Sequence, residues 1–101
     1  MGTTIREYYS NAFPNDYFGF VTGSASILRF PDQPAKLAKF VAYAANIGSF
    51  FIDRYGSAVS VFEIDGGVTT EWFAVKGENL QSYQYRNPSG SSDFMAYWVQ
   101  F

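Results

Sequence analysis

Two carboxylates come closest to a pattern that could carry out chemistry. Glu63 and Asp65 are two residues apart on a predicted strand, so their side chains point to the same side of it. A carboxylate pair so placed can act as general acid and general base. Both residues border the glycine turn at 66–67, and two solvated charges at the mouth of a turn explain them more simply. We therefore predict no catalytic site at this pair.

The rest of the sequence offers little reactive chemistry. It contains no histidine and no cysteine, which removes the commonest general base, the commonest nitrogen ligand of metals, and all thiolates. Without a histidine or a Ser-x-x-Lys motif, no serine or threonine has an evident base to activate it. Asp53 and Asp93 could each offer oxygens to a calcium ion, but nothing in the sequence clusters them. We predict that the protein is not an enzyme and binds no cofactor and no metal.

Charge argues against two further classes of partner. The chain has a net charge of −2, and its seven basic residues are scattered along the sequence. Binding to nucleic acid through phosphate contacts is therefore not expected. No apolar run approaches the ~18 residues of a membrane-spanning helix, and the first ten residues lack the charged and apolar regions of a signal peptide. No membrane partner is expected either.

Aromatic residues dominate the composition instead. They make up 21% of the 101 residues, as eleven Phe, eight Tyr and two Trp. Aromatic side chains fit a pleated, half-buried surface, so this content favours an all-β protein. So many rings also exceed what a small core needs, and aromatic residues are enriched at protein interfaces.

One group of rings suggests a second kind of binding. Exposed together, they would form a platform on which sugar rings stack: Trp72, Tyr83, Tyr85 and Trp98. Core packing or a protein interface is the competing explanation. It is favoured here because the Asn, Asp and Gln residues that a sugar site also needs are found mainly in turns.

The chain divides into an N-terminal arm, residues 1–17, and a single domain, residues 18–101. The arm has poor periodicity and carries aromatic side chains among polar ones, namely Tyr8, Tyr9, Phe13 and Tyr17. It is predicted to order against a neighbouring molecule, with a frayed terminus or a simple first strand as the alternative.

The segment 36–44 decides which faces of the domain are apolar. Both a helix and a strand fit its pattern, and the flanking prolines and glycine favour the strand. A strand places Ala38, Phe40, Ala42 and Ala44 on one face and Leu37, Lys39, Val41 and Tyr43 on the other. A second face that is also mostly apolar is covered by another sheet or forms an interface. The predicted interface residues of this segment are Leu37, Val41 and Tyr43.

Further extended segments follow at short spacing. Residues 18–30 are predicted to bend at Gly19 and Gly23, with 24–30 as the better-formed half. The other predicted strands are 48–54, 58–64, 68–75, 80–86 and 93–101, with a hairpin at Asp65-Gly66-Gly67 and a docked final residue, Phe101. Seven or eight short strands with turn signals between them predict an antiparallel β-sandwich, of either jelly-roll or immunoglobulin-like order.

The segment 24–101 resembles a pattern of small structural proteins of tailed-phage virions. In that pattern a Pro-containing turn, Gln33-Pro34, precedes a strand with small inward residues, then an Asn-x-Gly turn and an aromatic–aliphatic strand. The similarity covers residues 24–101 and is carried by Gln33, Ala42, Asn46, Gly48, Phe51, Ile64, Gly67, Asn79, Leu80 and Trp98. The chain departs from the pattern in the apolar Leu37, Val41 and Tyr43, in an apparent insertion at 76–78, and in the arm.

The resemblance implies a role in a virus particle. Such proteins are capsid decoration (cement) proteins, head fibres, or neck and tail accessories. By this similarity we expect a virion protein on the capsid surface that binds the major capsid protein and stabilises the shell. A homo-oligomer is expected, and a trimer would suit a site of threefold symmetry. The alternative is a neck, tail or fibre accessory protein whose sandwich binds carbohydrate.

Overall fold

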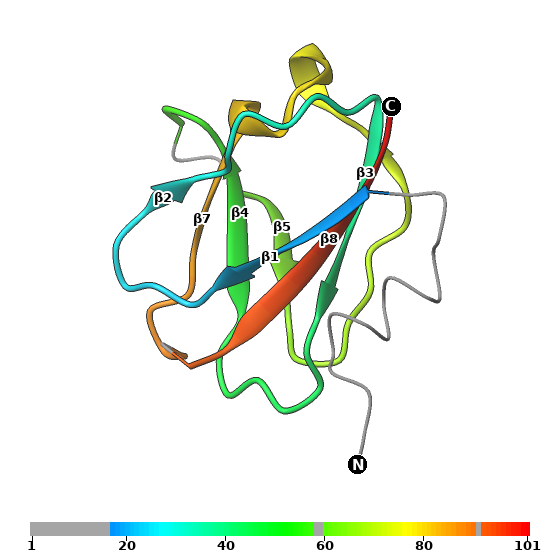
Figure 1. Cartoon of the computed structure of the whole chain (residues 1–101). Helices are drawn as coiled ribbons and strands as arrows, with labels where there is room; N and C mark the ends of the chain where they lie inside the picture. The colour runs from blue at the N-terminus through cyan, green and yellow to red at the C-terminus, as the bar shows by residue number, and fades with distance from the viewer. Residues whose placement is uncertain (1–16, 58–59, 91) are drawn as a thin grey trace.

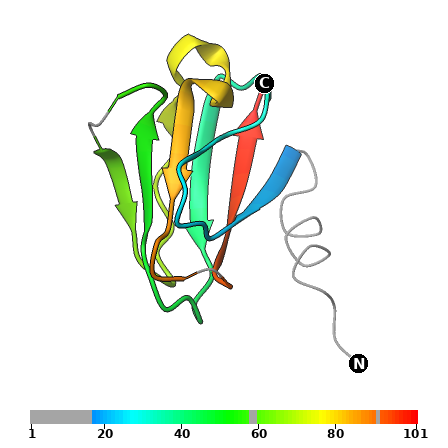
Figure 2. The same ribbon diagram turned by 90° about the vertical axis from the view of Figure 1, so that its left-hand side faces the viewer.

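The computed structural model describes residues 17–57, 60–90 and 92–101 and contains two four-stranded sheets packed face to face (Figures 1 and 2). The strands are short, and two of them have only two residues. Their bounds are β1 Tyr17–Thr22, β2 Leu28–Arg29, β3 Leu37–Ala42, β4 Phe50–Arg54, β5 Ser60–Ile64, β6 Phe73–Ala74, β7 Tyr83–Arg86 and β8 Phe94–Gln100. Within the described residues the fold is therefore all-β, as the aromatic content predicts.

The strand order identifies the type of sandwich. Sheet A has the order β1-β8-β3-β6 and sheet B has the order β2-β7-β4-β5. Each strand of the first half of the chain pairs antiparallel with its counterpart counted from the other end: β1 with β8, β2 with β7, β3 with β6, and β4 with β5. A long double-stranded hairpin rolled into two sheets gives this order, which is that of the jelly roll. The choice between jelly-roll and immunoglobulin-like order, open from sequence, is settled in favour of the jelly roll.

Aromatic rings fill the space between the sheets. Phe30 lies at the centre, with its ring 5.4 Å from Phe40, 4.7 Å from Tyr85 and 5.9 Å from Tyr97. Its exposed fraction is only 2%. Offset and edge-to-face ring pairs of this kind add to the apolar burial itself. The core therefore uses rings from both sheets and from the connection before β3.

The strand interpretation of 36–44 is confirmed. In β3 the side chains alternate: Ala38, Phe40 and Ala42 are buried, whereas Leu37 is exposed and Val41 is half-buried. Both neighbours of β3 are antiparallel strands, β8 and β6. Ala44, predicted inward, is instead exposed, because the strand ends at Ala42 and the chain turns.

The predicted segment 18–30 folds differently from expectation. Its first half forms the regular strand β1, and Gly19 lies inside that strand under the ring of Tyr97. The second half contains only the two residues of β2. The prediction that 24–30 is the better-formed half is therefore wrong. The longer strand forms where the chain can pair with all of β8, so tertiary pairing outweighs local propensity.

The turn at Asp65–Gly67 is not a hairpin, although the sequence predicts one. Val68 N donates to Asp65 O at 3.0 Å, and Gly67 has φ of 82°, so a glycine-dependent turn does form. However, β5 belongs to sheet B and β6 belongs to sheet A. The turn carries the chain across from one sheet to the other. Only residues 73–74 of the predicted strand 68–75 are regular.

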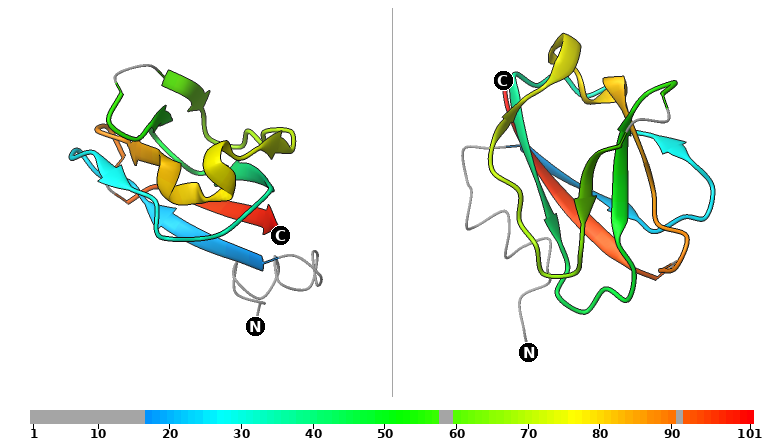
Figure 3. Two further views of the ribbon diagram at one scale, coloured as in Figure 1. Left: turned by 90° about the horizontal axis from the view of Figure 1, so that it is seen from above. Right: turned by 180° about the vertical axis from the view of Figure 1, so that it is seen from behind.

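Two short 3₁₀ turns, η1 Lys76–Glu78 and η2 Leu80–Ser82, lie at one end of the sandwich (Figure 3). The prediction of a strand from residue 80 is therefore correct only from Tyr83 onward. Asn79 lies between the two turns. Its Oδ1 accepts from Gln81 N of η2 at 3.0 Å and from Gln33 N at 3.1 Å. Phe101 at the same end is 70% exposed, so the docked final residue predicted from sequence is also wrong.

Candidate functional site

The two sheets differ sharply in what they show on their outer faces. The outer face of sheet B carries mostly polar side chains that oppose one another across the strands: Arg29, Asp53, Ser60, Glu63, Gln84 and Arg86, with Phe51 among them. The guanidinium of Arg86 covers the ring of Phe51, 4.5 Å from its centroid. Arg29, Ser60 and Glu63 face water, as is usual for the outer face of an antiparallel sheet, whereas Asp53 and Gln84 are polar but buried.

The outer face of sheet A is apolar instead. Pairing with β8 places the following residues on this face: Phe18, Phe20, Thr22, Leu37, Lys39, Val41, Phe94, Ala96, Trp98 and Gln100. Only Thr22, Lys39 and Gln100 in this set are polar. An outer face of this composition is unusual for an antiparallel sheet.

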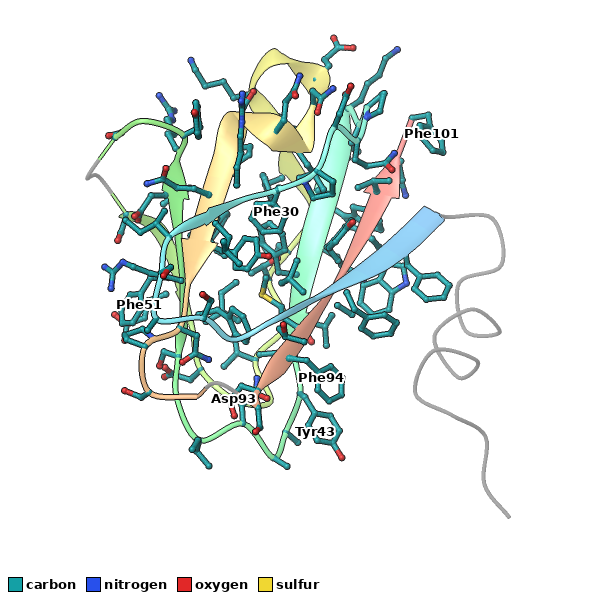
Figure 4. All side chains as sticks on the ribbon, turned by 60° about the vertical axis from the view of Figure 1, so that its left-hand side comes forward. Phe30, Tyr43, Phe51, Asp93, Phe94 and Phe101 are labelled. Atoms are coloured by element: carbon teal, nitrogen blue, oxygen red, sulfur yellow. The ribbon has the colours of Figure 1, made fainter. Side chains whose placement is uncertain are left out.

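A row of rings crosses this face from the end of β3 to β1. Tyr43 stacks on Phe94 with centroids 4.5 Å apart and planes at 19°. Phe94 meets Phe20 edge-on at 6.0 Å, and Phe20 meets Phe18 at 5.7 Å. Figure 4 shows Tyr43 and Phe94 side by side near the start of β8. Tyr43 is thus held by a ring from another strand, although it lies outside β3.

On the outer face of sheet A, the side chains at the centre are buried, whereas two side chains along and just after β3 are partly exposed. Trp98 and Ala96 are each 1% exposed. The amine of Lys39 lies 5.1 Å from the ring of Trp72 and 5.5 Å from that of Trp98, within the range of a cation–π interaction. Leu37 and Tyr43, by contrast, are each 36% exposed. We call Leu37, Val41 and Tyr43 the β3 margin.

The predicted platform of exposed rings is wrong for three of its four members. Tyr83 and Tyr85 are buried between the sheets, and the hydroxyl of Tyr83 accepts from Lys76 N at 3.0 Å. Burial raises the pKa of Tyr85 above its ordinary value. Trp98 is buried on the opposite face of sheet A, so the rings do not share a surface. Only Trp72 is partly exposed.

The aromatic residues predicted for the arm cannot be placed in the same way. Tyr8, Tyr9 and Phe13 lie outside the described residues. Tyr17 is the first residue of β1 and pairs with Val99. Their predicted role as interface residues stays a prediction.

A residue that the sequence does not single out projects from the loop between β3 and β4. Ile47 is 81% exposed, which is the largest exposed fraction among the large hydrophobic side chains of the described residues. We call Asn46, Ile47 and Gly48 the loop tip. The Asn-x-Gly turn signal identifies this loop in the sequence, but nothing local shows that its middle residue points outward.

The loop tip is fixed by hydrogen bonds to residues that are far away in the sequence. The amide of Asn46 pairs with the backbone of Phe94 in both directions, since Phe94 N donates to its Oδ1 at 3.1 Å and its Nδ2 donates to Phe94 O at 3.0 Å. The carboxylate of Asp93 accepts from Ile47 N at 2.9 Å and from Gly48 N at 2.7 Å. Asn46 therefore continues the ladder of β8 with its side chain.

Asp93 is the buried centre of this network. It is 4% exposed and accepts a third hydrogen bond from Asn87 Nδ2 at 3.0 Å. Burial acts to raise the pKa of Asp93, but the hydrogen bonds from Ile47, Gly48 and Asn87 outweigh it and lower the pKa below its ordinary value. Gly90 packs against the carboxylate, where a Cβ would overlap it. The geometry is that of a structural clamp, with the carboxylate fully occupied.

The carboxylates considered for chemistry do not form a common site. Glu63 and Asp65 are both exposed, and Asp65 Oδ1 accepts from the Ser49 hydroxyl. Asp53 is buried in sheet B, where it accepts from Ser60 Oγ at 2.9 Å. Among the described residues, no three acidic side chains gather in a group that could hold a metal ion.

The fold and this surface together define a class: a small jelly-roll sandwich with one polar outer face and one apolar outer face. Within the described part of the chain, no helix has the length and apolar character needed to span a bilayer. No family model, curated protein or solved structure matches this chain.

Proposed function

We propose that this protein is a structural binding protein that acts through the β3 margin of sheet A, and that it decorates the shell of a tailed-phage virion as a cement protein. The observation that carries the proposal is the contrast between the polar outer face of sheet B and the apolar outer face of sheet A. The virion setting is supported by the resemblance of residues 24–101 to small virion proteins and by the jelly-roll order, which many viral capsid proteins use.

In this role the protein works through binding free energy alone. Each copy contacts neighbouring shell subunits and binds the closed shell more tightly than separated subunits. Any molecule that binds only the assembled state stabilises that state by linkage. Leu37 and Tyr43 keep about a third of their surface exposed, so they are available for such a contact without unfolding of the sandwich.

A matched pair of variants tests the contact surface. Leu37→Asp places a charge on the β3 margin, and Val61→Asp places the same charge on sheet B, at a residue of nearly equal exposure, 38% against 36%. Both variants should fold. Heads of the phage that encodes the chain, prepared without it, are mixed with each purified protein and sedimented. We expect the wild type and Val61→Asp to sediment with the heads and Leu37→Asp to remain in the supernatant.

Three results would overturn the proposal. The wild type fails to bind the heads, or Leu37→Asp binds as well as wild type, or Leu37→Asp unfolds because Leu37 belongs to the core. Circular dichroism of each variant separates the last case from the others. The same experiment with Tyr43→Asp examines the other end of the margin.

The copy number in purified particles places the protein within the virion. A molar ratio to the major shell subunit near one, or a simple fraction of one, supports decoration of the shell lattice. A ratio of a few per cent would move the protein to the neck, tail or a fibre. A trimer would suit a threefold position on the shell, and analytical ultracentrifugation of the free protein tests it. The carbohydrate-binding alternative loses its support, because three of its four rings are buried.

A further inference from the structure

The loop tip combines an exposed apolar side chain with a backbone that is held on both sides. Ile47 leaves 81% of its side chain in water, so it contributes almost nothing to the core. Yet the backbone on both sides of it is held by a buried carboxylate and by an asparagine side chain.

Rigidity of this kind favours binding. Ordering a flexible loop at an interface costs conformational entropy, and a loop that is already fixed avoids that cost. Asn46 N also donates to Tyr43 O at 3.1 Å, which ties the tip to the β3 margin. Tyr43 in turn stacks on Phe94, whose backbone holds Asn46. These contacts join the tip to the Tyr43 end of the β3 margin.

The shape and charge of the tip indicate what it fits. A single branched aliphatic side chain on a protruding loop suits a small apolar pocket. The exposed carboxylate of Asp65 lies beside the tip, bonded to Ser49, the residue after Gly48. An acidic neighbour disfavours an anionic lipid surface and favours a protein with a cationic or hydrogen-bond-donating group at the rim of its pocket.

We infer that Ile47 is the anchor residue of the contact, inserting into an apolar pocket of the shell subunit with a basic side chain at its rim that meets Asp65. The inference rests on the proposed function and adds to it the residue that carries most of the affinity. Interfaces commonly concentrate their binding energy in a few side chains that fill pockets at the centre of the contact.

The test measures affinity for heads that lack the chain, by sedimentation across a range of protein concentrations. Ile47→Ser is compared with wild type and with Val61→Ser, which removes an exposed aliphatic side chain from sheet B. Loss of one buried isoleucine should weaken binding by about thirty-fold, whereas Val61→Ser should bind like wild type. Asp65→Lys reverses the rim charge and should also weaken binding, and less so at high salt.

The outcomes separate failure of the Ile47 anchor from failure of the proposed function. If wild type binds and Ile47→Ser binds equally well, the anchor is overturned and the proposed function stands. If wild type does not bind at all, the proposed function fails and the anchor fails with it. Binding of wild type to vesicles of phosphatidylcholine and phosphatidylglycerol, lost in Ile47→Ser, would assign the tip to lipid and overturn the inference. Thermal unfolding of Ile47→Ser should match wild type, which excludes misfolding as the cause.

Discussion

Replacement of Asp93 by asparagine tests the clamp behind the loop tip. Each carboxylate oxygen accepts one backbone N–H: Oδ1 from Ile47 at 2.9 Å and Oδ2 from Gly48 at 2.7 Å. Asp93→Asn keeps the shape of the side chain, but an amide has only one oxygen. Whichever way it turns, its own N–H faces one of the two donors. One backbone N–H therefore loses its acceptor.

The expected loss of stability follows from these contacts. A donor left unsatisfied costs about 1–3 kcal/mol, and hydrogen bonds that become neutral lose about 1 kcal/mol each. Removing a buried charge relieves its desolvation, which offsets part of this loss. The lowered pKa of Asp93 indicates that the hydrogen bonds to its charged form outweigh burial, and the N–H left without an acceptor makes the net effect of the substitution destabilising. We expect a loss of about 3 kcal/mol, which lowers the melting temperature by about 12–24 °C in a domain of this size.

The dependence on pH gives a second readout with a definite sign. The folded-state pKa of Asp93 lies below the ordinary value of 3.8, so its charged form stabilises the fold at neutral pH. This contribution is lost as pH falls below 3.8 through the folded-state pKa. Urea unfolding of wild type and Asp93→Asn should therefore show a full difference at neutral pH that shrinks in acid. Asp65→Asn, at an exposed acid, is the control and should differ from wild type by less than about 0.5 kcal/mol. A difference in Asp93→Asn that is absent at neutral pH, or constant with pH, would refute the reasoning.

Three further variants test the packing by urea unfolding. Gly19→Ala should destabilise by about 1–3 kcal/mol, because its Cβ would overlap the buried Tyr97 hydroxyl; a neutral effect would mean that the ring moves aside. Thr70→Val removes the oxygen that accepts from Phe40 N at 2.9 Å and should cost about 1–3 kcal/mol, and equal stability would show that this N–H finds another acceptor. Deletion of Phe101, which is 70% exposed, should change the free energy of unfolding by less than about 0.5 kcal/mol, and a larger loss would show that its ring is packed.

The strands that sequence predicts well are those whose faces differ in burial. In β3 the alternation of Ala38, Phe40 and Ala42 with their neighbours is enough, because one face meets the core. The same holds for Phe50 and Ile52 of β4, which are both buried. Period-two patterning of this kind records contact with the core directly, so it can be read without knowledge of the partner strand.

Connections between strands are harder to predict, because a turn signal is local. Asp65-Gly66-Gly67 supplies the positive φ that a tight reversal needs, and the reversal occurs. Whether the next segment pairs with β5 or crosses to the other sheet depends on β3, more than twenty residues earlier. There, Phe40 bonds to the side chain and the backbone of Thr70. No pattern within the turn carries that information.

The candidate contact surface was partly predictable for the same reason. The apolar character of Leu37, Val41 and Tyr43 is visible in the sequence, because these residues alternate with the inward residues of the segment 36–44, although only Leu37 and Val41 belong to β3. The exposure of Ile47 depends on Asp93 and Asn46, whose hydrogen bonds join segments 46 to 48 residues apart. Such long-range side-chain-to-backbone bonds have no sequence periodicity, so this part of the surface becomes visible only in the folded chain.

The pairing scheme of the jelly roll explains why the surface lies on sheet A. Because each strand pairs with its counterpart from the other end, the last strand, β8, lies between β1 and β3 in the interior of sheet A. Its inward residues Met95 and Val99 complete the core, which leaves Phe94, Ala96 and Trp98 on the outer side. An interior strand that is apolar on both sides must bury both. Sheet B covers the inward side of β8. The β3 margin borders its outward side. The contact that we propose at Leu37 and Tyr43 extends the burial that already covers Trp98.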